Sequence, residues 1–368
     1  MKKIFLSILA VAALASCTKM DTAYEAPQEI GFVAVGNNLT KAPVSGEVYP
    51  TDLNMYVNAY VHSTSVPETP DYIANGEFTH RTAKVDGKDV WGGKTPYYWP
   101  NEKTLHFSGY SKSGSFTSAA YNPSTDKLTI TGYNPGTGTA DGANDLMWFP
   151  STKYVQPNGY LGKDTKSVPV NMYHTCSWIT FMVQGDITTG ASNSTYKITS
   201  LTMNGVDMMA TVTCTGNASL AQATIPTYVV WSSNTDQTDA SPYNVTVNGG
   251  EVALKGTYTN ESTTTPKNIE TNVNTTIGGN IVVIPQKPGT IDIEWTYKSS
   301  TTADVEDSAT NLSLSLGKET INGLEVEKSW LPGKHYIYTI TIKANEILIA
   351  PTPVDWTTPS DNNNVTVG

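Results

Sequence analysis

The stretch VPVNMYHTCSWITFMV, residues 168–183, decides the fold class of this chain of 368 residues. Apolar and polar residues alternate along it, which is the period of a strand with one buried face. The apolar residues occupy even positions up to Met172 and odd positions from Ile179 onward. A change of parity inside a strand-like run predicts a β-bulge near residues 174–178.

Similar runs recur on both sides of this stretch, for example at 30–35, 53–61 and 291–297, and clusters of Gly, Pro, Asn and Asp separate them. The 20 tyrosines and 8 tryptophans, with abundant Ser and Thr, suit strands better than helices. Many short strands joined by turns predict an all-β chain built from sandwiches or barrels.

The first residues have the form of an export signal. Lys2 and Lys3 precede an apolar run over residues 4–15, which is too short to span a bilayer. Leu14-Ala15-Ser16-Cys17 resembles the lipobox of bacterial lipoproteins. That resemblance implies cleavage between Ser16 and Cys17, acylation of Cys17, and a location at the cell outer membrane, exposed at the surface.

The composition argues against nucleic-acid binding, because the formal net charge is −10 and Arg81 is the single arginine. The sequence has no zinc-type cysteine spacing, phosphate loop or Gly-x-Ser-x-Gly turn, so no metal, cofactor or catalytic residue is expected. His174 is interpreted as a hydrogen-bonded strand residue. Cys176 and Cys214 are either a disulfide, which export would permit, or two buried thiols.

The expected organisation follows the changes in composition, since a stretch with few apolar residues interrupts the strands near the middle of the chain. In order, the segments are a signal peptide (1–16), a tether (17–28), an N-terminal β-sandwich (29–184), a linker (185–195), a C-terminal β-sandwich (196–358) and a tail (359–368).

Four motifs occur in a fixed order along the mature chain: Asp145-Leu146-Met147-Trp148, residues 168–174, residues 330–340 and Val354-Asp355-Trp356. Behind a lipobox, this order resembles the fimbrillin family, the type V pilins and fimbrillin-like lipoproteins of Bacteroidetes. The resemblance implies two tandem β-sandwiches of transthyretin-like topology. It also implies assembly with other fimbrial subunits into surface fimbriae that adhere to a host or bacterial ligand.

The resemblance further implies a route of assembly. In the family a protease removes the first strand, and a strand from a neighbouring subunit fills the groove that is left. The strand here would be residues 30–35, and the donor would be residues 354–368. The candidate processing site is Lys41-Ala42, where relatives have arginine before alanine.

Two other functional classes remain as alternatives. An outer-membrane glycan-binding lipoprotein would expose coplanar aromatic side chains on one face, whereas a fimbrial subunit would bury them. A glycan-degrading enzyme would need two carboxylates that converge in a cleft. Asp21-Thr22-Ala23 and Asp307-Ser308-Ala309 resemble the O-glycosylation pattern of Bacteroidetes, which makes Thr22 and Ser308 candidate sites.

Overall fold

The computed structural model describes sixteen segments of the chain. They are residues 28–36, 49–63, 65–85, 87–100, 103–111, 113–136, 145–155, 167–186, 195–216, 225–233, 243–245, 252–255, 275–298, 306–321, 324–343 and 347–355. The signal peptide, Ser16, Cys17, Thr22, Lys41, Ala42 and the tail all lie outside these residues, as do most of the tether and of the expected linker.

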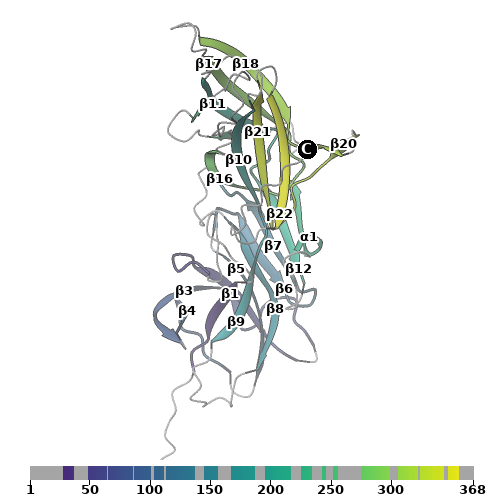
Figure 1. Cartoon of the computed structure of the whole chain (residues 1–368). Coiled ribbons are helices and arrows are strands. Elements are labelled where there is room, and N and C mark those ends of the chain that lie inside the picture. Colours follow the sequence, from purple (N-terminus) through teal and green to yellow (C-terminus); the bar gives the residue numbers. More distant parts are fainter. Residues whose placement is uncertain are drawn as a thin grey trace, which may run out of the picture.

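The all-β class is confirmed, and the strands form an elongated molecule (Figure 1). Seven strands pair side by side until the last meets the first, which makes a closed barrel. In pairing order they are β1 (Gly31–Gly36), β4 (Lys88–Gly93), β3 (Ile73–Val85), β2 (Met55–Val61), β5 (Thr104–Ser111), β8 (Met147–Val155) and β9 (Val168–His174). Alternate residues of these strands point inward and form a core that includes Phe32, Phe78 and Phe107.

A second sheet packs on the outside of the barrel. It consists of β13 (Val229–Ser233), β12 (Ala210–Thr215), β7 (Lys127–Tyr133) and β6 (Ser118–Asn122). Outward-facing barrel residues such as Trp148 and Tyr173 meet Ile130 and Val212 of this sheet. The same cluster includes Trp178, which belongs to the next part of the fold, so this central core joins the two ends of the molecule.

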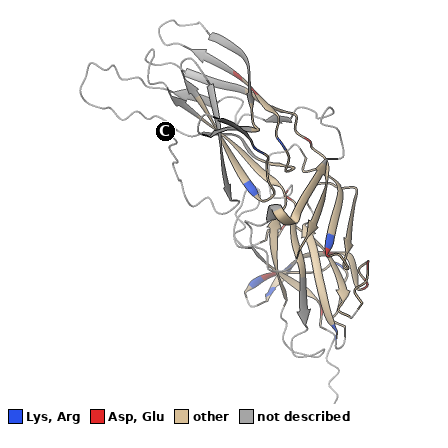
Figure 2. Cartoon of the chain, turned by 90° about the vertical axis from the view of Figure 1, so that its right-hand side faces the viewer, with Lys and Arg blue, Asp and Glu red and all other residues tan. Residues whose placement is uncertain are grey.

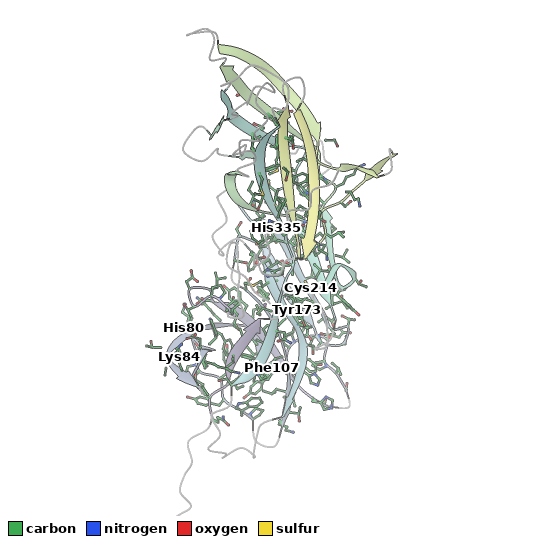
Figure 3. All side chains as sticks on the ribbon, viewed as in Figure 1. His80, Lys84, Phe107, Tyr173, Cys214 and His335 are labelled. Carbon is green, nitrogen blue, oxygen red and sulfur yellow. The ribbon has the colours of Figure 1, made fainter. Side chains whose placement is uncertain are left out.

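The other end is a sandwich of two sheets. One sheet consists of β16 (Thr275–Val283), β10 (Ser177–Asp186), β21 (Lys334–Lys343) and β22 (Ile347–Asp355). The other consists of β14 (Tyr243–Val245), β11 (Thr195–Asn204), β17 (Thr290–Lys298) and β18 (Glu306–Ser315), with β15 (Val252–Lys255) also paired to β11. Their inner faces share a third core. Figure 3 marks Phe107 in the barrel, Tyr173 and Cys214 in the central core, and His335 on the sandwich.

Two short elements complete the described part. β19 (Lys318–Ile321) and β20 (Leu324–Glu327) form a separate hairpin. Helix α1 (Ile225–Tyr228) has four residues. Among the residues with described structure, no helix has the length and apolar character that crossing a bilayer requires.

The strand pairing differs from the expected division near the middle of the chain. β9 ends at His174 and β10 begins at Ser177, and the two belong to different sheets. The change of parity therefore marks a crossing from barrel to sandwich, so the expected bulge within one strand is wrong. β10 thus lies on the sandwich side, although its residues up to 184 were expected in the first domain.

The second difference concerns β12 and β13, which come later in the sequence than β10 and β11. Instead of joining the sandwich, β12 pairs antiparallel with β7 beside the barrel. Val212 and Cys214 of β12 align with Ile130 and Leu128 of β7, so both strands turn an apolar face to the central core. The first structural unit therefore takes strands from both sides of residue 185.

Candidate functional site

The strand β1 occupies a distinct position, because it lies between β9 and β4 in the barrel and pairs in parallel with the first and antiparallel with the second. Ile30, Phe32 and Ala34 are buried and alternate with Gly31 and Val33, which are partly exposed. The Phe32 ring meets Phe78 edge-on at a centroid distance of 4.9 Å and Phe107 at 5.2 Å. Burial of each large apolar side chain stabilises the fold by about 1.5–3 kcal/mol.

The two neighbours of β1 hold it unequally. Five residue pairs join β1 to β9 in parallel, from Phe32↔Val168 to Gly36↔Met172. Only Gly31 and Phe32 pair with β4, which is antiparallel. A Cβ atom on Gly31 would lie 3.1 Å from the Val90 side chain, so the strand passes close to its neighbour here.

A salt bridge lies just before the start of β1. The Arg81 guanidinium lies 3.0 Å from Glu29 Oε1 and donates a 2.6 Å hydrogen bond to the Gly93 carbonyl. Both charged side chains are about two-fifths exposed, at 42% and 41%. An exposed pair of this kind contributes about 0–1 kcal/mol, so it orients the segment more than it stabilises it.

This geometry decides what the β1 seat can do. We use the name β1 seat for the facing edges of β4 and β9 together with the inner surface around Phe78 and Phe107. If β1 left the seat, backbone groups of both edges would lose partners and an apolar surface would meet water. An incoming strand with alternating apolar residues would restore both.

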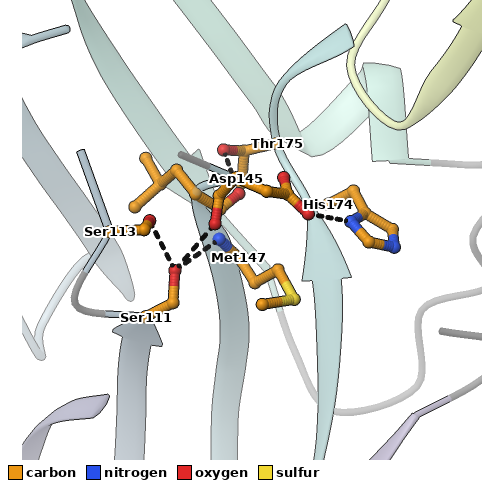
Figure 4. Close-up of polar contacts among 7 residues, drawn as sticks. Ser111, Ser113, Asp145, Met147, His174 and Thr175 are labelled. Atoms are coloured by element: carbon orange, nitrogen blue, oxygen red, sulfur yellow. Dashed lines mark hydrogen bonds and ion pairs between the residues drawn. The ribbon is translucent and has the colours of Figure 1, made fainter. Parts of the chain in front are cut away.

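A buried polar cluster lies where β5 and β9 end and β8 begins (Figure 4). His174 Nδ1 lies 2.6 Å from Asp145 Oδ2, and both residues are at most 1% exposed. The Ser111 hydroxyl donates to the Asp145 carbonyl at 3.1 Å and accepts from the Met147 amide at 2.8 Å. Thr175 donates twice to the Leu146 carbonyl, from its amide and from its hydroxyl.

The cluster holds histidine, aspartate and serine, but it lacks the relation of a catalytic triad. Ser111 bonds to the main chain of Asp145 and Met147 and to the Ser113 hydroxyl, whereas a nucleophilic serine would bond to the imidazole. Ser111 and Asp145 are fully buried, which leaves a substrate no approach. The expectation that His174 is a hydrogen-bonded strand residue is confirmed.

The motif at residues 330–340 packs against the segment in which the chain passes from β9 of the barrel to β10 of the sandwich. The Lys334 amide donates to the Leu331 carbonyl, and Gly333 has a φ of 67°, which defines a tight turn that favours glycine. The Gly333 amide donates to the Cys176 carbonyl at 2.8 Å, and the Ser177 hydroxyl donates to Leu331. Three of the four motifs quoted from the sequence therefore meet where the chain passes from barrel to sandwich.

His335 follows that turn and stacks on Trp178, with ring centroids 3.6 Å apart and planes within 6°. Its Nε2 lies 2.9 Å from the Thr180 hydroxyl. Burial lowers the pKa of His335 to about 3, so the imidazole is neutral at physiological pH.

The two described cysteines, Cys176 and Cys214, are buried in the central core as free thiols. Burial raises the pKa of both thiols well above the usual value, which keeps them protonated. Among the described residues, no group of three or more His, Cys, Asp or Glu side chains could hold a metal ion.

The tryptophans discriminate between the alternatives. Trp91, Trp99, Trp148, Trp178 and Trp330 are each at most 6% exposed. Trp231 is half-buried and donates to the Thr175 carbonyl. A sugar platform needs exposed rings, whereas these six side chains pack in the hydrophobic cores or against them. Charged residues are sparse along the described ribbon (Figure 2), and Lys and Arg form no continuous stripe there.

The predicted site residues have different outcomes. The strand expected at residues 30–35 is β1, and it sits inside a sheet as predicted. Ser308 lies on β18, opposite Thr296 of β17. The expected donor begins within β22, where Val354 and Asp355 pair with β21. Sequence reasoning missed the Arg81–Glu29 salt bridge, and the singular occurrence of arginine was the only signal for it.

Comparison with known proteins gives one family. The family model described as fimbrillin-like matches residues 40–356. The sequence matches no curated protein at a significant level.

Solved structures resemble the fold at low identity. A fimbrial protein from Bacteroides vulgatus superposes with a TM-score of 0.54 at 14% identity, covering 90% of this chain and 100% of the other. A fimbrial assembly protein from Parabacteroides distasonis has a TM-score of 0.39 at 10% identity, covering 89% and 99%.

Proposed function

The chain belongs to the fimbrillin-like family, and from that premise we propose that it is a lipid-anchored fimbrial subunit that assembles by strand addition and mediates adhesion. Its partners are other fimbrial subunits and a ligand on a host or bacterial surface. It acts at the outer membrane, and neither its assembly nor its adhesion uses a cofactor, a metal or a catalytic step.

The β1 seat is the observation that carries this proposal. β1 closes the barrel, yet it pairs with β4 through only two residues. The family match begins at residue 40, after β1 and next to the candidate processing site at Lys41-Ala42. A strand that precedes the matched residues and lies in an apolar groove suits removal and replacement.

Cleavage and assembly are expected to be linked. Fibres are expected to begin at Ala42, because cleavage after Lys41 frees the segment that carries β1. Lys41→Gln should abolish the ladder of detergent-resistant multimers in unboiled envelope fractions. N-terminal sequencing and immunoblotting measure the two outcomes. Lys84→Gln is the matched control, since Lys84 is an exposed lysine on β3 after which no cleavage is expected.

An experiment with a synthetic peptide distinguishes the role of the β1 seat from that of the protease. A synthetic strand of residues 29–35 should bind the processed subunit and stop growth of the ladder, because it refills the seat. The same peptide with Phe32→Asp should not, since a carboxylate would enter the apolar core. Fully assembled fibres that still begin at Cys17 would contradict strand removal.

The anchor is proposed at Cys17. Cys17→Ala should leave an uncleaved precursor or a soluble form, because the acyl chains that hold the protein in the membrane need the thiol and the new amino terminus. Fractionation into membrane and soluble pools measures this, with Cys176→Ala as the control cysteine. A Cys17→Ala variant that still partitions into the membrane would rule out the anchor.

Glycan binding by an aromatic platform is the other candidate, and the buried tryptophans of the described residues weigh against it. O-glycosylation at Thr22 and Ser308 remains a proposal. Mass spectrometry of the mature protein with each residue changed to alanine would test it.

A further inference from the structure

Two histidines face each other on the outer surface of the barrel. His106 belongs to β5, where it lies opposite Tyr60 of β2, and His62 follows the end of β2 directly. His106 Nε2 lies 3.0 Å from His62 Nδ1. His62 is exposed and His106 is half-buried, so solvent reaches the pair.

The surrounding contacts fix this arrangement. The His106 ring stacks on Tyr60 with centroids 4.8 Å apart and planes within 12°, and Tyr60 itself is only 6% exposed. The His62 amide donates to the Thr104 carbonyl at 2.8 Å, which holds its main chain against β5. One ring is therefore held rigidly, while the other can rotate about a fixed main chain.

We propose that His62 and His106 form a binding site for a divalent transition-metal ion of the Ni²⁺, Cu²⁺ or Zn²⁺ class. Imidazole nitrogen is a preferred ligand of these ions, with metal–nitrogen distances of about 2.0–2.1 Å. Two nitrogens on one ion are then about 2.9 Å apart at a right angle and about 3.3 Å apart at a tetrahedral angle. The observed separation of 3.0 Å lies within that range.

Binding requires little rearrangement. The two facing nitrogens share a hydrogen in the free protein, and both must present lone pairs to a metal. Each neutral ring then carries its N–H on the far nitrogen, so no proton leaves the site. A small rotation of the exposed His62 ring opens room for the ion, whereas the Tyr60 stack keeps His106 in place.

The ligand set predicts the strength and order of binding. Among the described residues no third His, Cys, Asp or Glu joins the pair, so water completes the coordination. Such a site binds Cu²⁺ more tightly than Ni²⁺ or Zn²⁺. It is distinct from the β1 seat, and it does not depend on the assembly proposed above.

The test is calorimetric titration of the untagged, membrane-extracted protein with NiCl₂. We expect one equivalent to bind, and His62→Gln and His106→Gln each to weaken binding by at least about tenfold. With Cu²⁺, the electron paramagnetic resonance spectrum should show coupling to two nitrogens in the unchanged protein and to fewer in either variant.

His80→Gln provides the matched control. His80 is also a partly exposed strand histidine, but its Nε2 contacts the Asp89 carboxylate at 3.0 Å rather than a second imidazole. This variant should bind Ni²⁺ as the unchanged protein does. Equal weakening in all three variants, unchanged binding in the His62 and His106 variants, or no binding by the unchanged protein at millimolar Ni²⁺ would each overturn the proposal. Thermal unfolding of every variant verifies that it is folded.

Discussion

Phe32→Ala is expected to destabilise the uncleaved chain by about 3–5 kcal/mol, because it empties a fully buried site in the barrel. The ring lies among Phe78, Phe107 and Phe149, which come from three other strands. Those strands are held by their own pairings and can collapse only partly into the space. Chemical unfolding followed by tryptophan fluorescence measures the loss.

Val33→Ala is the control for that experiment. Val33 is the next residue on the same strand, but it is partly exposed and points away from the aromatic cluster. It should cost about 1 kcal/mol or less. If the two variants lose equal stability, β1 does not hold the barrel through Phe32, and the β1 seat would lose its main apolar anchor.

The same variant connects stability with assembly. A strand that is less firmly seated leaves its groove more often, so uncleaved Phe32→Ala protein should form some multimers without a protease. A ladder in the Lys41→Gln, Phe32→Ala double variant would show that cleavage acts by releasing β1.

The sequence predicted β1 well because its signal is local. Apolar residues on both faces of Ile30 to Val35 predicted a strand inside a sheet, and β1 lies between β4 and β9. The sequence did not predict which strands pair with β1. The pairing Phe32↔Val168 joins distant parts of the chain, and short-range periodicity carries no record of which strands become neighbours.

The middle of the chain shows where such reasoning fails. The change of parity between Met172 and Ile179 was visible, but alternation cannot distinguish a bulge from a strand that leaves one sheet for another. The deciding contacts are the bonds of Thr175 to Leu146 and of Gly333 to Cys176, which come from motifs far apart in sequence. The residue types in these motifs predicted turns and strands, but they did not predict that the motifs contact one another.

The candidate site was predicted to a similar degree. The strand β1 itself follows from its pattern, whereas its place in the barrel, the Phe78 and Phe107 surface, and the Arg81–Glu29 salt bridge arise only from tertiary packing. The pairing of β12 with β7 could not be predicted either, since a short alternating run such as ATVTCT fits any half-buried sheet.

Val212→Asp should have the other large effect, at least about 3–5 kcal/mol, because it leaves an unpaired carboxylate in the central core. Val212 is 0% exposed and lies between Ile130 of β7 and Trp231 of β13 in the sheet that covers the barrel. Chemical unfolding measures the loss of free energy, and limited proteolysis reports which strands open.

The pattern of unfolding tests the architecture more sharply than the magnitude does. The central core contains Trp148 of the barrel, Val212 of the covering sheet, and Trp178 and Val282 of the sandwich strands. Damage at Val212 should therefore open the barrel cover and loosen the crossing between the two ends. Thr213→Asp is the control, because Thr213 faces outward beside Val230, which is 60% exposed, and should cost under about 1 kcal/mol. If both variants lose equal stability, or if Val212→Asp exposes only the sandwich to protease, β12 does not pack on the barrel. The first structural unit would then end before residue 185 after all.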